Sequence, residues 1–284
     1  MATFTNQALL TLSGNTVASN VASGELLDVL SLSKTAVGNS YNADGDITYI
    51  VTLTNTGTAA VSGITLTDNL GAYTSGNAVL YPLAYKANSI RYFVNGVLQA
   101  APAVTAGPPM TVTGITVPAG GNVNIVYEAD VTDFAPLTAG STITNTASAA
   151  GAGALNTVTD SETVTVASQP NLRLVKEISP NPVTSGSTVT YTIRIENYGN
   201  TAVTAADDAI ISDILNPVLT NLTATFNGTA WTVGTNYTYN TATGLFTTAS
   251  NQISVPAATF TQDATTGIVT TTPGVSTLVL TGTI

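Results

Sequence analysis

An internal repeat is the feature that most constrains how this chain can fold. Five residues of an early stretch recur in a later stretch, in the same order and at a constant interval of 142 in residue number, which indicates two copies of one domain. The matched pairs are Lys34 and Lys176, Tyr49 and Tyr191, Asn55 and Asn197, Gly57 and Gly199, and Val61 and Val203. We therefore expect one domain over residues 27–168 and a second over residues 169–284, with residues 169–171 as the linker.

Residues 1–26 resemble the end of the first copy. Three positions match at an interval of 139 in residue number, and a further tripeptide matches at an interval of 141. The matches are Thr3, Asn6 and Ala8 with Thr142, Asn145 and Ala147, and residues 15–17 with residues 156–158. The second copy reaches Ile284 without a comparable stretch. We therefore expect the second domain to lack its last strand, and residues 1–26 to form an extension that carries an equivalent strand.

Short strands separated by turns are expected in both copies. Apolar and polar residues alternate over stretches such as 46–54 and 122–131, which is typical of half-buried strands. Asn95-Gly96 and Asn227-Gly228 favour tight hairpin turns because both residue types tolerate positive φ. Residues 102–109 are expected to form a loop. No window has a sustained helical period, so the pattern predicts an all-β protein with two tandem β-sandwiches.

Composition excludes several classes of partner. The chain has 6 Lys+Arg against 16 Asp+Glu, and this net charge of −10 opposes binding to nucleic acid or to an anionic membrane. Histidine and cysteine are absent, which removes the commonest general base, imidazole metal ligands and disulfides. No apolar run is long enough to span a bilayer, and the N-terminus has no recognisable signal peptide. We expect no enzymatic activity, no cofactor and no metal.

Five short motifs also occur in a fixed order along the first copy. They are Lys-Thr-Ala at 34–36, Gly-Asp-x-Thr-Tyr at 45–49, Thr-Asn-Thr-Gly at 54–57, Thr-Asp-x-Leu at 67–70 and Thr-Ile-Thr-Asn-Thr-Ala at 142–147. This order resembles the prokaryotic surface-protein repeat called domain of unknown function eleven. The resemblance implies immunoglobulin-like β-sandwiches in cell-surface, stalk or fibre proteins, with no common enzymatic activity.

The unmatched strand predicts a filament subunit. If residues 1–26 complete the second sandwich of a neighbour, subunits join head to tail by donor-strand complementation, and a contact that does not close produces a fibre. The side chains expected to enter the neighbour are Phe4, Asn6, Ala8, Leu10, Leu12, Val17 and Val21. The partner is then the protein itself, on an extracellular appendage of a cell or spore surface, with an unidentified anchor protein. Two alternatives are a floppy leader and a segment folded back on its own second sandwich.

Each copy also contains a lysine and an aspartate that can meet an asparagine in the last strand. In some immunoglobulin-like surface domains such a set forms an isopeptide bond, in which a neutral lysine attacks the asparagine amide and releases ammonia. The candidate residues are Lys34, Asp68 and Asn145 in the first copy, and Lys176 and Asp213 with Asn6 of the next subunit in the second. An ion pair beside a hydrogen-bonded asparagine is the simpler interpretation.

The remaining candidates indicate structure more than chemistry. Asp44 with Asp46, and Asp207 with Asp208, could suggest calcium, but solvated turns explain them better because no EF-hand pattern accompanies them. Trp231 and the tyrosines are spread along strands, which favours packing over a ligand platform. The alternative function is a monomeric adhesin or stalk module that binds a glycan or protein through the loops at 73–88 and 102–110.

Overall fold

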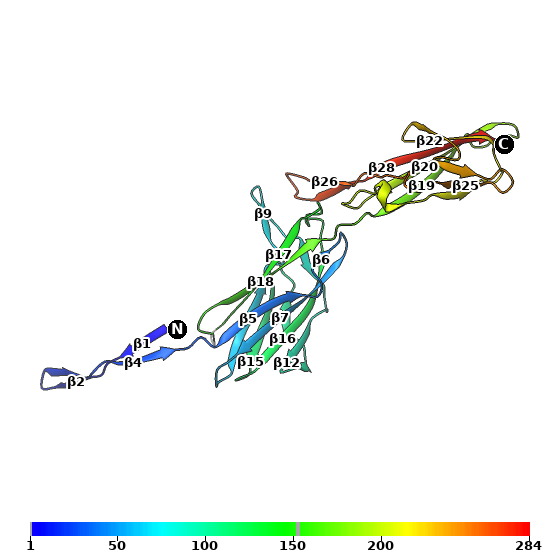
Figure 1. Cartoon of the computed structure of the whole chain (residues 1–284). Helices are drawn as coiled ribbons and strands as arrows, with labels where there is room; N and C mark the ends of the chain where they lie inside the picture. The colour runs from blue at the N-terminus through cyan, green and yellow to red at the C-terminus, as the bar shows by residue number, and fades with distance from the viewer. Residues whose placement is uncertain (1, 152–153) are drawn as a thin grey trace. The chain divides into compact units, whose positions relative to one another are not determined.

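A computed structural model describes residues 2–151 and 154–284, and β-strands dominate throughout (Figure 1). The chain divides into two compact units. The first unit contains the chain up to Ala135 together with Thr142–Thr165, and the second contains Pro136–Ser141 together with Val166–Ile284. Within the described residues the one helical segment is the 3-10 turn η1 (Ala205–Asp207), and no helix there is long and apolar enough to cross a bilayer.

The first unit is a sandwich of two antiparallel sheets, as the layered strands of Figure 1 show. One sheet has the order β13 (Val97–Gln99), β12 (Arg91–Val94), β16 (Asn122–Val131), β7 (Asp46–Asn55) and β5 (Leu30–Ala36), with β11 (Leu83–Tyr85) also on β16. The other has the order β14 (Ala103–Thr105), β15 (Met110–Val117), β8 (Val61–Asp68), β17 (Thr142–Gly151), β18 (Val158–Val166) and β6 (Ser40–Tyr41). A small hairpin of β9 (Tyr73–Ser75) and β10 (Ala78–Leu80) lies outside both sheets. Alternate residues of the central strands are buried, so the core lies between the sheets.

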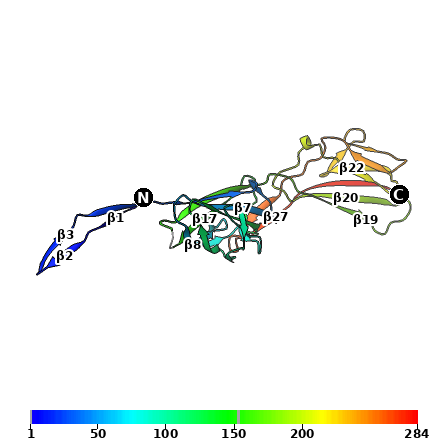
Figure 2. The same ribbon diagram turned by 90° about the horizontal axis from the view of Figure 1, so that it is seen from below.

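The second unit repeats this strand order. Its five-stranded sheet contains β19 (Leu172–Ser179), β20 (Thr188–Asn197), β28 (Gly274–Thr283), β22 (Thr220–Phe226) and β23 (Thr229–Trp231), of which Figure 2 labels β19, β20 and β22. Its three-stranded sheet contains β24 (Tyr237–Tyr239), β25 (Leu245–Thr248) and β21 (Ser212–Ile214), in the order of β14, β15 and β8. A separate hairpin is formed by β26 (Thr259–Gln262) and β27 (Val269–Thr272).

The two units differ where the repeat predicts a difference. In the first unit β8 pairs with β15 on one side and with β17 on the other, and β18 continues the sheet beyond β17. In the second unit β21 pairs with β25 alone among the described strands. The second unit therefore has no described strand where β17 and β18 lie in the first unit.

Residues 2–26 form a long two-stranded ribbon, which we call the N-terminal hairpin. Its base pairs β1 (Ala2–Asn6) with β4 (Ala22–Leu26), and its tip pairs β2 (Leu9–Leu12) with β3 (Asn15–Ala18) (Figure 2). The turn at the tip is formed by Ser13 and Gly14, which both have positive φ. Among the described strands these four pair only with one another. An isolated two-stranded hairpin is marginally stable in water, so a partner surface would stabilise it.

The all-β fold and the two tandem β-sandwiches are confirmed, and so are the two tight turns. Asn95-Gly96 joins β12 to β13 and Asn227-Gly228 joins β22 to β23, all four residues with positive φ. The loop expected at residues 102–109 is wrong in part, because Ala103–Thr105 pairs with β15 as an edge strand. Phe4, Ala8, Leu10 and Leu12 fall on even positions, a period-two pattern that predicts one half-buried strand, and this prediction is wrong for the single chain. That stretch is split into two strands, and its side chains are exposed.

Candidate assembly site

The N-terminal hairpin carries a row of exposed apolar side chains. Leu10 and Val17 are cross-strand partners and lie on the same face, with 69% and 66% of their surfaces exposed. Phe4, Leu12 and Val21, also predicted to enter a neighbour, are exposed as well. Contiguous apolar surface of this kind on a soluble protein marks an interaction site. The residues predicted as donors therefore lie on an uncovered ribbon.

The second unit exposes apolar side chains beside the unpaired side of β21. Leu172 on β19 corresponds to Leu30 on β5, yet it is 47% exposed whereas Leu30 is 5% exposed. Leu174 of the same strand is also exposed. We call this surface, formed by the open side of β21 and the facing residues of β19, the acceptor groove.

In the first unit β17 and β18 cover the equivalent surface. The inward residues of β17 include Ile143, Asn145, Ala147 and Ala149, and all four are buried. β18 adds a polar link to the opposite sheet, because Asp160 Oδ2 accepts a hydrogen bond from the Lys34 backbone N–H at 2.8 Å. The first unit thus shows this surface when both covering strands are in place.

The tip of the hairpin matches this covering pair of strands in register as well as in sequence, whereas its base, where Asn6 pairs with Ala22, is offset from the pairing of Asn145 with Glu162 by one residue. By the same intervals, 139 for the first strand and 141 for the second, Leu9 corresponds to Ser148 and Ala18 to Thr159. Ser148 pairs with Thr159 in the β17–β18 ladder, and Leu9 pairs with Ala18 in the β2–β3 ladder. The tip of the hairpin therefore reproduces the pairing of β17 with β18.

A cluster of polar side chains lies buried beneath β17. Lys34 Nζ forms an ion pair with Asp68 and donates a hydrogen bond to the Tyr127 hydroxyl at 2.8 Å. The Tyr127 hydroxyl donates to Asp68 and accepts from Asn145 Nδ2 at 3.4 Å. The structure thus brings together the predicted Lys34, Asp68 and Asn145, all buried. The sequence motifs do not include Tyr127, because its partners Lys34 and Asp68 are distant in sequence.

Burial controls the charge of this cluster. It lowers the pKa of Lys34, because desolvation outweighs the attraction of the Asp68 carboxylate. The pKa of Tyr127 lies well above its usual range, first because of burial and then because of Asp68. The Lys34 side-chain nitrogen also sits 4.5 Å from the centre of the Tyr49 ring. The cluster is therefore an ion pair of Lys34 and Asp68 beside the hydrogen-bonded amide of Asn145. The same arrangement places the Lys34 amine, with its lowered pKa, beside that amide.

The second unit holds the same pair in an uncovered state. Lys176 Nζ lies 2.5 Å from Asp213 Oδ2 and 4.5 Å from the centre of the Tyr191 ring. The two side chains are 40% and 17% exposed, whereas those of Lys34 and Asp68 are fully buried. Asn6, the predicted third member, lies on the N-terminal hairpin, and no asparagine contact to Lys176 is described within the chain.

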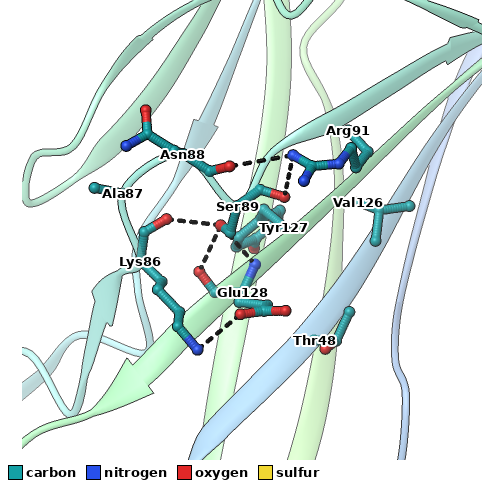
Figure 3. Close-up of a pocket in the computed structure, with 9 residues that line it drawn as sticks. All are labelled: Thr48, Lys86, Ala87, Asn88, Ser89, Arg91, Val126, Tyr127 and Glu128. Atoms are coloured by element: carbon teal, nitrogen blue, oxygen red, sulfur yellow. Dashed lines mark hydrogen bonds and ion pairs between the residues drawn. The ribbon is translucent and has the colours of Figure 1, made fainter.

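A separate pocket of about 360 Å³ lies on the outer face of the first unit, near the predicted 73–88 contact loop (Figure 3). The two cationic side chains that line it, those of Lys86 and Arg91, already have partners within the protein. Lys86 pairs with Asp46 at 2.6 Å and with Glu128 at 2.8 Å, and these carboxylates raise the pKa of Lys86. Arg91 donates to backbone carbonyls, including that of Asn88 at 3.1 Å. The pocket therefore offers a ligand little unused charge.

The other sequence candidates have structural partners. Asp46 is held by Lys86, and Asp207 accepts hydrogen bonds from Thr204 at the start of η1. Within the described part of the chain, no group of three or more acidic residues is placed to hold a metal ion. Trp231 stacks on Phe226 with ring centres 5.0 Å apart, which is a packing contact.

Solved structures with distant similarity include two pilus proteins. The pilus backbone RrgB of Streptococcus pneumoniae aligns with 86% of this chain and 55% of its own, at 13% identity and a TM-score of 0.34. A C-terminal fragment of the major pilin GBS80 of Streptococcus agalactiae aligns with 62% of this chain and 67% of its own, at 13% identity and a TM-score of 0.35. The collagen-binding domain of a Staphylococcus aureus adhesin aligns with 49% of this chain and 99% of its own, at 11% identity and a TM-score of 0.31.

The chain spans about half the length of the first of these proteins. No protein-family model matches the chain, and no curated protein sequence matches it. Similarities at this level identify neither a family nor a function, so the motif-based resemblance to the surface repeat stays a prediction.

Proposed function

We propose that this protein is the structural subunit of an extracellular filament, in which the N-terminal hairpin of one subunit fills the acceptor groove of the next. The observation that carries the proposal is the register match. The tip of the hairpin reproduces the pairing of β17 with β18, and in the second unit no described strand lies where β17 and β18 lie in the first unit. Such a contact joins unlike surfaces and does not close, so it propagates as a fibre.

The proposed contact has a defined inward face. In a filled groove Phe4 takes the position of Ile143, Asn6 that of Asn145, and Leu10 that of Ala149, because each pair is separated by the same interval of 139. Val17, the cross-strand partner of Leu10, faces inward on the returning strand, as do Ala8 and Leu12 on the first strand. Val21 corresponds to Glu162 by the interval of 141, but in the hairpin Asn6 pairs with the next residue, Ala22. The predicted donors of the first strand and Val17 therefore share the face that enters the groove.

Burial and backbone pairing both favour this assembly. Each large apolar side chain that leaves water on docking contributes roughly 1.5–3 kcal/mol, and exposed residues on both surfaces supply several such groups. The free edge of β21 gains the ladder that β8 already has with β17. Strand addition of this kind supplies main-chain hydrogen bonds along the whole contact.

Two adjacent positions on the hairpin provide a matched test. Leu10→Lys places a charge on the inward face, whereas Thr11→Lys places the same charge on the outward face. We expect purified wild-type protein and Thr11→Lys to form filaments in negative-stain micrographs, and Leu10→Lys to remain monomeric. Removal of residues 2–25 gives the same loss as Leu10→Lys.

Filaments that persist after removal of residues 2–25 would contradict the proposal. If Leu10→Lys and Thr11→Lys changed filament formation equally, the assignment of Leu10 to the inward face would be wrong. In a binding assay, an adhesin acting through its loops would keep its ligand after the hairpin is removed, and this separates the alternative function from assembly.

A further inference from the structure

The two lysine–aspartate pairs differ in what covers them. β17 covers Lys34 and Asp68 completely, whereas Lys176 and Asp213 lie in the acceptor groove and remain partly exposed. In the proposed filament, the neighbour's hairpin takes the place of β17. An inference about the second pair therefore rests on the proposed function.

We propose that docking of the hairpin starts a reaction that seals the subunit joint with an amide bond between Lys176 Nζ and Cγ of the neighbouring subunit's Asn6. The joint would then be covalent, formed by the two chains alone without an added enzyme or cofactor.

Strand register places the amide over the lysine. In the first unit Ala147 pairs with Asp68, and Asn145 lies two residues before it on the same inward face. On the hairpin, Asn6 lies two residues before Ala8 in the same way. In the covered cluster, Lys34 Nζ and Asn145 Nδ2 lie 2.8 and 3.4 Å from one oxygen, that of Tyr127. A hairpin docked in this register thus brings an amide next to the Lys176 amine.

The second unit differs from the first at the group between amine and amide. Tyr127 pairs with Tyr49 in the β16–β7 ladder, and Leu280 pairs with Tyr191 in the β28–β20 ladder. Leu280 therefore takes the place of Tyr127, and that position supplies no hydroxyl to separate the amine from an incoming amide. The aromatic ring beside the amine is kept, as Tyr191.

The reaction balances with the residues at the joint. Burial disfavours a charged pair, so the docked lysine and aspartate exchange a proton and become an amine and a carboxylic acid. Nζ attacks Cγ of the asparagine and forms the new C–N bond. The carboxylic acid then gives its proton to Nδ2, the Cγ–Nδ2 bond breaks, and ammonia leaves. The carboxylate takes the surplus proton from Nζ, so Asp213 ends the reaction as the acid that began it and no other reactant is consumed.

Exposure before docking gives the reaction its timing. In a free subunit Lys176 and Asp213 meet water, which stabilises both charges, and an ammonium ion is not a nucleophile. Docking removes that water and delivers the amide in one step. Free subunits are thus unreactive, and only assembled joints become sealed.

The test compares filaments in micrographs with the same filaments boiled in sodium dodecyl sulfate. We expect wild-type filaments to give a ladder of covalent oligomers on a gel. Digestion should release a cross-linked peptide that contains Asn6 and Lys176 and is lighter by one ammonia than its two parts. Lys176→Met should form filaments that run as monomers, and Lys86→Met, at an exposed lysine of the first unit, should keep the ladder.

Each outcome decides between the two proposals. Wild-type filaments that run entirely as monomers, or a ladder that survives Lys176→Met, would overturn the covalent joint and leave the filament proposal intact. Absence of filaments from the wild-type protein would overturn both. If Lys176→Met does not fold, the cross-linked peptide from the wild type still decides the question.

Discussion

At the scale of single residues, the hydrogen bonds of Asn55 explain why asparagine occurs at this position in both copies. Its buried side chain donates to the carbonyl oxygens of Ala59 at 2.8 Å and Pro118 at 3.1 Å, and it accepts from Gly57 N–H at 2.9 Å. Asn197 makes the equivalent bonds in the second unit, including one to Pro256 O at 3.0 Å. In each unit one amide holds together two turns at the end of the sandwich.

Replacing Asn55 with alanine should therefore destabilise the first unit. Asn55 Nδ2 also donates to the buried Val117 carbonyl at 3.3 Å, and a buried carbonyl left without a donor costs about 1–3 kcal/mol. With the other lost bonds, we expect Asn55→Ala to lower the free energy of unfolding by roughly 2–4 kcal/mol. Thr58→Ala, at an exposed position of the same loop, is the matched control and should change it by less than about 0.5 kcal/mol. Urea denaturation measures both. Equal effects of the two substitutions would contradict the structural role of Asn55.

The buried tyrosines predict how stability depends on alkaline pH. Burial raises the pKa values of Tyr41, Tyr49 and Tyr127 above their usual range. Above about pH 10 the unfolded chain loses these protons while the folded chain keeps them, so stability falls as pH rises, by up to ~1.4 kcal/mol per pH unit for each tyrosine. Denaturant midpoints at pH 8 and above pH 10 check this. An unchanged midpoint would show that these hydroxyls titrate alike in both states.

At the scale of elements, motif reading found the strands but not all of their roles. Alternating residues and Asn-Gly turns located most strands of the first unit, because one face of each is buried and each turn requires positive φ. The sequence predicts an equivalent strand within residues 1–26, whereas the structure has four paired strands there, because pairing between strands is a long-range property. Tyr127 was missed for the same reason, since its partners are distant in sequence.

The counterpart of β8 shows a different limit. The interval between matching positions is 142 at Val61 and Val203 but 145 at Asp68 and Asp213. The extra residues lie in the segment that forms η1, and the long strand β8 is reduced to an isolated bridge at Val203 and the short β21. A repeat fixes which residues correspond, but an insertion changes how much of the strand can pair.

Binding of the hairpin to the groove can be measured without filaments. A chain that lacks residues 2–25 keeps an empty groove, and a synthetic peptide of residues 2–26 should fill it. We expect the peptide to raise the unfolding temperature of the second unit as its concentration increases, because it binds the folded state only. A peptide with Leu10→Lys is the control and should have little effect. No shift at saturating peptide would contradict the assignment of the groove.

At the scale of the whole molecule, the repeat suggests how to close the subunit on itself. Tyr127 and Leu280 hold matching places, so by the same interval Val131 corresponds to Ile284. In the first unit, residues 132–141 connect β16 to β17. Joining a copy of residues 132–141 and then residues 3–26 to Ile284 therefore offers the second unit its own covering strands, in the order that the first unit uses.

We expect this extended chain to be a monomer whose second unit unfolds at a higher temperature than in the unassembled parent chain. A covalently attached hairpin has a high effective concentration at its own groove and excludes a neighbour's hairpin. Light scattering gives the mass, and calorimetry gives the unfolding temperatures. An added segment with Leu10→Lys at the matching position should fail to block assembly. Filaments from the unmodified extended chain would mean that subunits join through some other surface.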